Sequence, residues 1–233
     1  MMLHGLGGMG KSVLAHEYAH VYASRYPAGR FLLPAEGKEE LKALLVTLAP
    51  ELGIELTDEE RTDTDLAHRR VCATLASAVQ ERGGPALVLL DNVDDPTLLT
   101  RAAVSNVLPS PDDLHVIATT RLEEGKLQAG TCLEVGPLPE GHAENLFNKH
   151  RPFTEEIDPE SARTAARKIS RKLGCYPLAV EVAAVYLRET PEVSYSDFLE
   201  RLEREGIGAV EGAGADDRIQ LSNHPETLIS ALI

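Results

Sequence analysis

The 233-residue sequence has no tryptophan and only three cysteines, Cys72, Cys132 and Cys175. They are odd in number and widely spaced, so neither a disulfide framework nor a zinc ribbon is indicated, and a reducing cytoplasm is the expected location. Basic residues are also scarce, with 23 Lys and Arg against 37 Asp and Glu and a formal net charge of -14. Nucleic-acid binding needs clustered Lys and Arg, so this balance argues against a nucleic-acid partner.

Long apolar runs are absent as well. The longest, Ala86 to Leu90, has about five residues, whereas a membrane span needs about twenty. No basic segment followed by an apolar stretch precedes the first glycines, so we expect neither a membrane partner nor export. With 43% hydrophobic residues, the chain is long enough for one α/β domain and a smaller helical domain.

Strand and helix patterns alternate through the first part of the sequence. Short apolar runs predict strands at 30–33, 86–90, 114–119 and 132–135. Apolar residues at helical spacing predict helices at 11–25, 39–49 and 65–82, the first with Leu14, Tyr18, Val21 and Tyr22 on one face. This alternation predicts a parallel sheet covered by helices, in a domain at 1–138 whose first strand is truncated.

The pattern becomes purely helical after residue 138. Asp158 and Pro159 favour a helix start, the almost wholly apolar stretch 178–187 favours a buried helix, and Ser194 with Asp197 forms a capping box. We therefore expect an all-helical domain at 139–205. Residues 206–233 are expected to be a linker and the start of a further, missing domain.

A glycine-rich segment opens the chain. Residues 5–12 read Gly-Leu-Gly-Gly-Met-Gly-Lys-Ser, which fits G-x-x-x-x-G-K-[ST], a loop whose backbone N–H groups surround phosphates. The helix that follows adds the positive end of its dipole. The alternative is a flexible glycine loop, and chance produces the pattern in about one such chain in a hundred. We expect phosphate contacts from Gly5, Gly7, Gly8, Met9, Gly10, Lys11, Ser12 and Val13.

An acidic residue follows the most apolar strand. Asp91 comes at the carboxyl end of 86–90, where a phosphate-loop protein needs a carboxylate to hold Mg²⁺ together with Ser12. Asp91 and Asp94 are the catalytic candidates of this segment. Asp94 or its neighbours either orient the attacking water or form a solvated acidic turn before Pro96.

Thr119-Thr120-Arg121 closes the next strand. The carboxyl ends of parallel strands meet at one sheet edge, so these side chains are expected near the phosphate loop. Arg121 either contacts a γ-phosphate or pairs with a surface carboxylate.

A competing motif lies in the first helix. His16-Glu17-Tyr18-Ala19-His20 fits H-E-x-x-H, the helical pair of a zinc peptidase. We disfavour this interpretation because the same helix carries the phosphate loop at its start and because the sequence offers no third ligand.

Four motifs in order resemble the nucleotide-binding part of NB-ARC proteins, which belong to the STAND class of signalling P-loop ATPases. They are residues 5–12, Leu-Leu-Asp-Asn-Val-Asp-Asp at 89–95, Thr-Thr-Arg at 119–121 and Leu-Gly-Cys-Tyr-Pro-Leu-Ala at 173–179. The resemblance covers nearly the whole chain, and the wording of 91–95 is closer to bacterial members than to plant ones.

The resemblance implies a cytoplasmic switch that is inactive with ADP and that assembles into homo-oligomers with ATP and Mg²⁺, in signalling or defence. Thr120 and Arg121 then sense the terminal phosphate, Pro177 and Leu178 lie near adenine, and effector and sensor domains lie outside this chain. Asn92 stands where many members carry a second acid, so slow ATP hydrolysis is expected. A non-hydrolysing scaffold and a metabolic P-loop kinase are the alternatives.

Overall fold

The computed structural model describes residues 1–110, 112–127, 130–206 and 208. These residues fall into two compact units. The first contains the described residues of Met1–Gly5 and Lys11–Val135, and the second contains Leu6–Gly10 and the described residues from Gly136 to residue 208. Most of the segment expected to be a linker and a further domain, 206–233, lies outside the described residues.

The first unit is built on a five-stranded parallel sheet with the order β2-β3-β4-β1-β5. Each pairing is parallel, which confirms the predicted sheet. The most apolar strand lies inside the sheet, as a strand buried on both faces must. The strands are β1 (Met2–His4), β2 (Gly29–Pro34), β3 (Ala86–Val93), β4 (Leu114–Thr120) and β5 (Cys132–Glu134).

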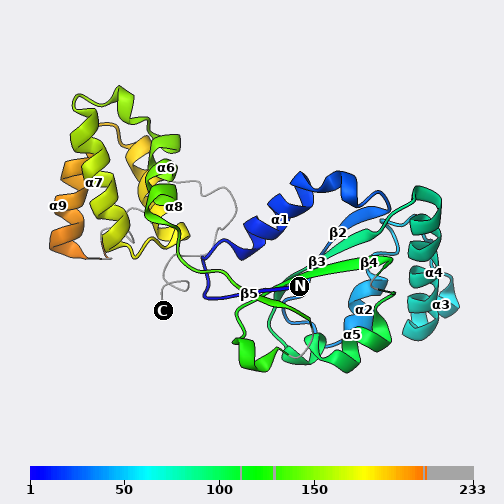
Figure 1. The fold of residues 1–233 in the computed structure, drawn as a ribbon. Coiled ribbons are helices and arrows are strands. Elements are labelled where there is room, and N and C mark those ends of the chain that lie inside the picture. Colours follow the sequence, from blue (N-terminus) through cyan, green and yellow to red (C-terminus); the bar gives the residue numbers. More distant parts are fainter. Residues whose placement is uncertain (111, 128–129, 207, 209–233) are drawn as a thin grey trace. The chain divides into compact units, whose positions relative to one another are not determined.

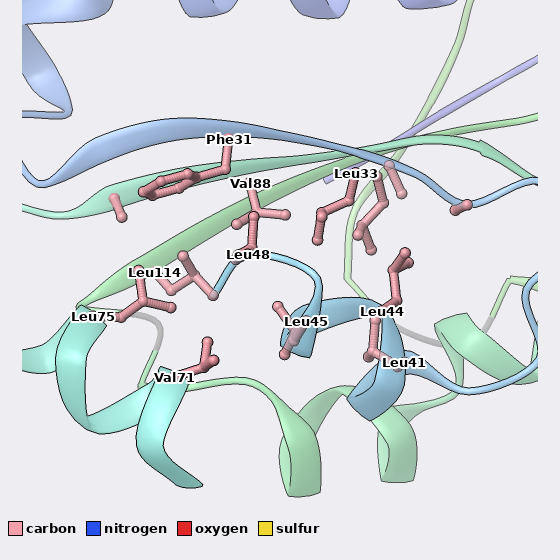
Figure 2. Packing of buried hydrophobic residues seen from close by; sticks show 14 of the residues in the cluster. Phe31, Leu33, Leu41, Leu44, Leu45, Leu48, Val71, Leu75, Val88 and Leu114 are labelled. Atoms are coloured by element: carbon pink, nitrogen blue, oxygen red, sulfur yellow. The ribbon is translucent and has the colours of Figure 1, made fainter. Parts of the chain in front are cut away.

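Helices cover both faces of this sheet (Figure 1). Helix α1 lies on one face, and the other helices of the unit pack on the opposite side. Alternate residues of β3 serve the two layers, because Val88 faces the α2 and α4 side (Figure 2) while Leu87 and Leu89 belong to the cluster of α1. The helices are α1 (Lys11–Val21), α2 (Leu41–Val46), α3 (Asp58–Thr62), α4 (Thr64–Arg82) and α5 (Arg101–Val107).

The face of α1 that packs on the sheet differs from its most apolar face. Ala15 and Ala19 are buried, whereas Leu14, Val21 and Tyr22 are exposed. The structure therefore turns three residues of the predicted apolar stripe away from the sheet, whereas Tyr18 packs against the cluster of α1 and the sheet. Small alanine side chains let the helix backbone approach β3 and β4 closely, so the spacing of large residues did not mark the contact face.

The second unit is helical, as predicted for this part of the chain. Helix α8 is buried on nearly every side, and Ser194 and Asp197 form the predicted capping box at α9. The helices are α6 (Glu140–His150), α7 (Pro159–Lys172), α8 (Pro177–Glu189) and α9 (Tyr195–Glu205). Short 3-10 turns in the two units span Ala23–Arg25, Pro96–Leu99, Glu124–Lys126 and Phe153–Glu155.

One arginine of this helical unit contacts both the segment that follows α6 and the segment at the end of α8. The Arg151 guanidinium forms a salt bridge with Glu156 and donates to the carbonyls of Leu187 and Val193 at 2.9 and 2.8 Å. Both charged side chains are mostly buried, at 14% and 12% exposure. The pair therefore fixes the turns after α6 and α8.

Among the residues that the structure describes, no helix combines the length and the apolar character needed to cross a membrane.

Candidate functional site

The glycine loop has the backbone conformation that its sequence predicts. Gly5, Gly8 and Gly10 have φ values of 141°, 73° and 81°, a region that residues with a Cβ rarely adopt. A Cβ on Gly5 would also lie 2.5 Å from the Val135 carbonyl oxygen. Glycine is therefore required at position 5 for close backbone approach as well as for its dihedral angle.

Lys11 begins α1 and is folded back onto the loop. Its Nζ atom donates to the Gly5 carbonyl oxygen at 2.8 Å, and the residue is only 8% exposed. Burial, and to a smaller extent the nearby charge of Arg121, lower the Lys11 pKa to about 8, while the charge of Asp91 opposes this shift. A negative charge bound beside this ammonium, in addition to that of Asp91, would stabilise the charged form of the buried Lys11. This is a property expected of an anion-binding site.

Ser12 and Asp91 meet across the sheet edge. The Ser12 hydroxyl donates to Asp91 Oδ1 at 2.6 Å, although the two residues are far apart in sequence. A hydroxyl and a carboxylate are oxygen ligands of the type that Mg²⁺ prefers, so these residues fit the metal expected here. The structure thus brings together the two residues predicted to hold magnesium.

The end of β3 carries an irregularity that sequence reasoning missed. The register passes from Leu90 opposite Ala118 to Val93 opposite Thr120, so β3 has one extra residue. Asn92 takes up this residue with a left-handed φ of 59°, a conformation that asparagine tolerates better than most residues. The amide at position 92 is therefore explained by backbone geometry.

The two threonines of Thr119-Thr120-Arg121 have different surroundings. The Thr119 hydroxyl donates to Asp91 Oδ1 at 2.5 Å. Thr120 is fully buried, and its hydroxyl donates to the Val93 carbonyl oxygen at 2.6 Å. Thr119, which was not among the predicted site residues, is therefore the threonine in contact with Asp91, the acid predicted to hold Mg²⁺. Arg121 follows β4 and is exposed.

Asp94 and Asp95 both have backbone partners. Asp94 accepts from the Gly37 N–H through both carboxylate oxygens, at 3.1 and 3.0 Å. Asp95 caps the 3-10 turn by accepting from the Thr97 N–H, and this hydrogen bond lowers its pKa. These contacts give each carboxylate an anchoring role, and the catalytic role of Asp94 stays a prediction.

The loop and the segment of Pro177 meet within the second unit. The Leu178 N–H donates to the Gly8 carbonyl oxygen at 3.2 Å. Immediately before α8, Gly174 and Cys175 are both left-handed, with φ of 60° and 53°, which ends α7 and redirects the chain. The structure therefore places Pro177 and Leu178 at the first turn of α8, next to a loop carbonyl.

The remaining predicted residues have varied positions. Met9 is buried, whereas Val13 lies on the exposed side of α1. His16 and His20 are also exposed. Within the described ranges, no three His, Cys, Asp or Glu residues gather as a metal site would require.

Comparison with known protein families identifies the family of this chain. The model of the NB-ARC domain matches residues 1–150, which is more than half of the chain. The chain belongs to the NB-ARC family. A relative of this NB-ARC chain is the regulatory protein AfsR of Streptomyces coelicolor, which is 29% identical over 186 residues. That match covers 78% of this chain and 17% of AfsR, so the chain spans a small part of its relative.

Two solved structures resemble the NB-ARC chain in fold. One is a chain of the Drosophila ORC bound to DNA, with a TM-score of 0.57 and 15% identity over 89% of this chain and 61% of that one. The other is Cdc6p from Pyrobaculum aerophilum, with a TM-score of 0.52 and 13% identity over 95% and 61% of the two chains. At such low identity the likeness concerns the fold alone.

Proposed function

We propose that this NB-ARC chain is a switch that binds ATP or ADP with Mg²⁺ and differs in state according to the nucleotide bound. One observation supports it above all: Lys11, Ser12 and Asp91 converge at the start of α1. The positive charge of Arg121 is near enough to the Lys11 ammonium to lower its pKa, so two cations lie close to the loop. Membership of the NB-ARC family supports nucleotide binding in general.

The proposed roles follow from chemistry and from the family. The loop amides and Lys11 hold the β- and γ-phosphates, while Ser12 and Asp91 would hold Mg²⁺, which neutralises phosphate charge when it is bound. Arg121 responds to the terminal phosphate, and the buried Thr120, whose hydroxyl contacts the Val93 carbonyl oxygen, holds the end of the strand that precedes Arg121. By resemblance to the family, Pro177 and Leu178 lie near the base.

The output of the switch is proposed on the resemblance alone. The ATP-bound state forms homo-oligomers in the cytoplasm and acts on effector and sensor domains outside this chain, in signalling or defence. The match to a regulatory protein supports a signalling role. A nucleotide-binding scaffold without hydrolysis is the second candidate, and it is favoured by the backbone partners of Asp94 and Asp95.

Calorimetric titration with ATP and with ADP, each with Mg²⁺, tests nucleotide sensing. A lost charge-assisted hydrogen bond costs about 1.5–3 kcal/mol, so Arg121→Ala is expected to lower the ATP affinity about tenfold or more. The ADP affinity is expected to change little, because ADP lacks the γ-phosphate.

Arg25→Ala is the matched control. It removes the same charge from an exposed residue of the first unit that stacks over Tyr22, 5.3 Å from the ring centre. An unchanged ratio of ATP to ADP affinity in Arg121→Ala would contradict the sensing role. Absence of binding by the unaltered chain would contradict the proposed function as a whole.

A further inference from the structure

The Thr119 hydroxyl at the end of β4 contacts both the backbone and a side chain of β3. It accepts from the Asn92 backbone N–H at 2.9 Å and donates to Asp91 Oδ1 at 2.5 Å. Thr119 is 2% exposed at the end of β4, so water does not compete strongly for these contacts. The hydroxyl therefore connects the backbone of β3 to the side chain of Asp91.

The direction of these bonds is set by proton count. A threonine hydroxyl has one hydrogen and two acceptor lone pairs. Because Asn92 supplies an N–H to the oxygen, the single hydroxyl proton is left to point at Asp91. The β-branched side chain also has few rotamers, so the donor is fixed before any ligand binds.

The bulge in β3 is what makes this arrangement possible. Its extra residue puts Asn92 in the left-handed region, and the Asn92 N–H meets the Thr119 hydroxyl instead of a ladder carbonyl. Local ladder pairing is thereby replaced by a side-chain contact next to Asp91. Bulges of this kind often redirect a side chain beside a functional site.

The consequence falls on the Asp91 carboxylate. Ser12 and Thr119 both donate to Oδ1, so these two hydrogen bonds fix the plane of the carboxylate and leave Oδ2 outside them. Outer partners that orient a metal-binding carboxylate are known to control metal affinity. Ser12 is itself a proposed metal ligand, whereas Thr119 can keep its hydrogen bond throughout.

We propose that Thr119 is a positioning residue that holds Asp91 in the orientation needed for Mg²⁺. This inference rests on the proposed function, since it concerns the metal of the nucleotide site. It assigns to Thr119 a role separate from that of Thr120, whose hydroxyl contacts the backbone of Val93 and Leu122. A purely structural role for Thr119 would affect folding but leave the magnesium response unchanged.

The test is a titration of the ADP-loaded chain with Mg²⁺, in which the heat of binding is measured by calorimetry. The affinity for ADP in the presence of EDTA is measured in parallel. Thr119→Val keeps the side-chain shape and removes the hydroxyl. The Mg²⁺ concentration at half-saturation is expected to rise roughly 10- to 100-fold, as for other outer-shell losses. The ADP affinity in EDTA is expected to stay within about twofold, because the Thr119 hydroxyl is engaged with the Asn92 N–H and Asp91 and has no proposed contact with the phosphates.

Two further variants separate positioning from structure. Thr119→Ser keeps the hydroxyl and is expected to restore the Mg²⁺ midpoint to within about threefold of the unaltered chain. Thr47→Val removes a hydroxyl that contacts only the Leu44 carbonyl in the same unit and is expected to leave the midpoint unchanged. Thermal unfolding of each variant monitors the fold, and Thr119→Ala replaces Thr119→Val if the latter fails to fold.

The outcomes distinguish this inference from the proposed function. A folded Thr119→Val or Thr119→Ala variant with an unchanged Mg²⁺ midpoint overturns the positioning role while nucleotide binding stands. If the unaltered chain binds no nucleotide, or binds it without any response to Mg²⁺, the proposed function and this inference both fail.

Discussion

The lowered pKa of Lys11 predicts that nucleotide binding takes up a proton in mildly alkaline solution. Burial, followed by the charge of Arg121, lowers the pKa from 10.5 to about 8 in the free protein. A bound polyphosphate brings several negative charges to the ammonium and should raise this pKa again. Above about pH 8, a proton must therefore be bound together with the nucleotide.

The size of the effect follows from the shift. If bound nucleotide restores an ordinary lysine pKa, uptake is about half a proton at pH 8 and about nine-tenths at pH 9. The nucleotide affinity then falls about tenfold between pH 7 and pH 9. Calorimetry in buffers of different ionisation enthalpy measures the protons taken up. Lys11→Arg is the control, because its guanidinium stays charged over this range and its proton uptake should be near zero.

The same shift has a consequence for folding. The unfolded chain binds more protons at Lys11 than the folded chain does between about pH 8 and pH 10.5, so the Lys11 contribution to stability rises with pH in that window. At neutral pH the buried charge costs at most about 3 kcal/mol. Lys11→Met should therefore raise the free energy of unfolding while it weakens nucleotide binding. Proton uptake near zero at pH 9 in the unaltered chain would refute this reasoning.

Two further predictions concern the anchoring contacts. Asp94→Asn keeps an oxygen that can accept from the Gly37 N–H, so we expect the rate of single-turnover ATP hydrolysis to stay within about threefold of that of the unaltered chain. Loss of a general base lowers such a rate about 100-fold or more. A decrease of that size would show that Asp94 is the base. Arg151→Met leaves Glu156 and three carbonyl groups without this donor, and we expect the free energy of unfolding in urea to fall by about 3–5 kcal/mol. Arg151→Lys should recover part of that stability, and a loss below about 1 kcal/mol for Arg151→Met would contradict the clamp.

Much of the sheet could be predicted from sequence because its strands are short, apolar and separated by helical patterns. The run from Ala86 to Leu90 predicted a strand buried on both faces, and β3 is such a strand. Helices α3, α5 and α6 were not predicted. The first two are only 5 and 7 residues long, so few apolar positions reveal their period.

The phosphate loop could be located because its chemistry requires glycines and a lysine at fixed spacing. The neighbouring contacts could not be found in the same way. Choosing between Thr119 and Thr120 requires knowing the pairing register of β3 against β4, which places Leu90 opposite Ala118, and the sequence alone does not give this register. The asparagine at position 92 did not by itself predict the left-handed φ found there, because asparagine is common in ordinary turns as well.

The extra residue in β3 also limits how this segment can change over evolution. Val93 is buried opposite Thr120, whereas Asp91 points toward Ser12. Deleting Asn92 would restore a regular strand in which the acid and the valine still face opposite sides of the sheet, because consecutive strand residues alternate. It would also remove the left-handed residue whose N–H contacts Thr119, so such a deletion is expected to leave the packing of the valine intact and to change the surroundings of Asp91.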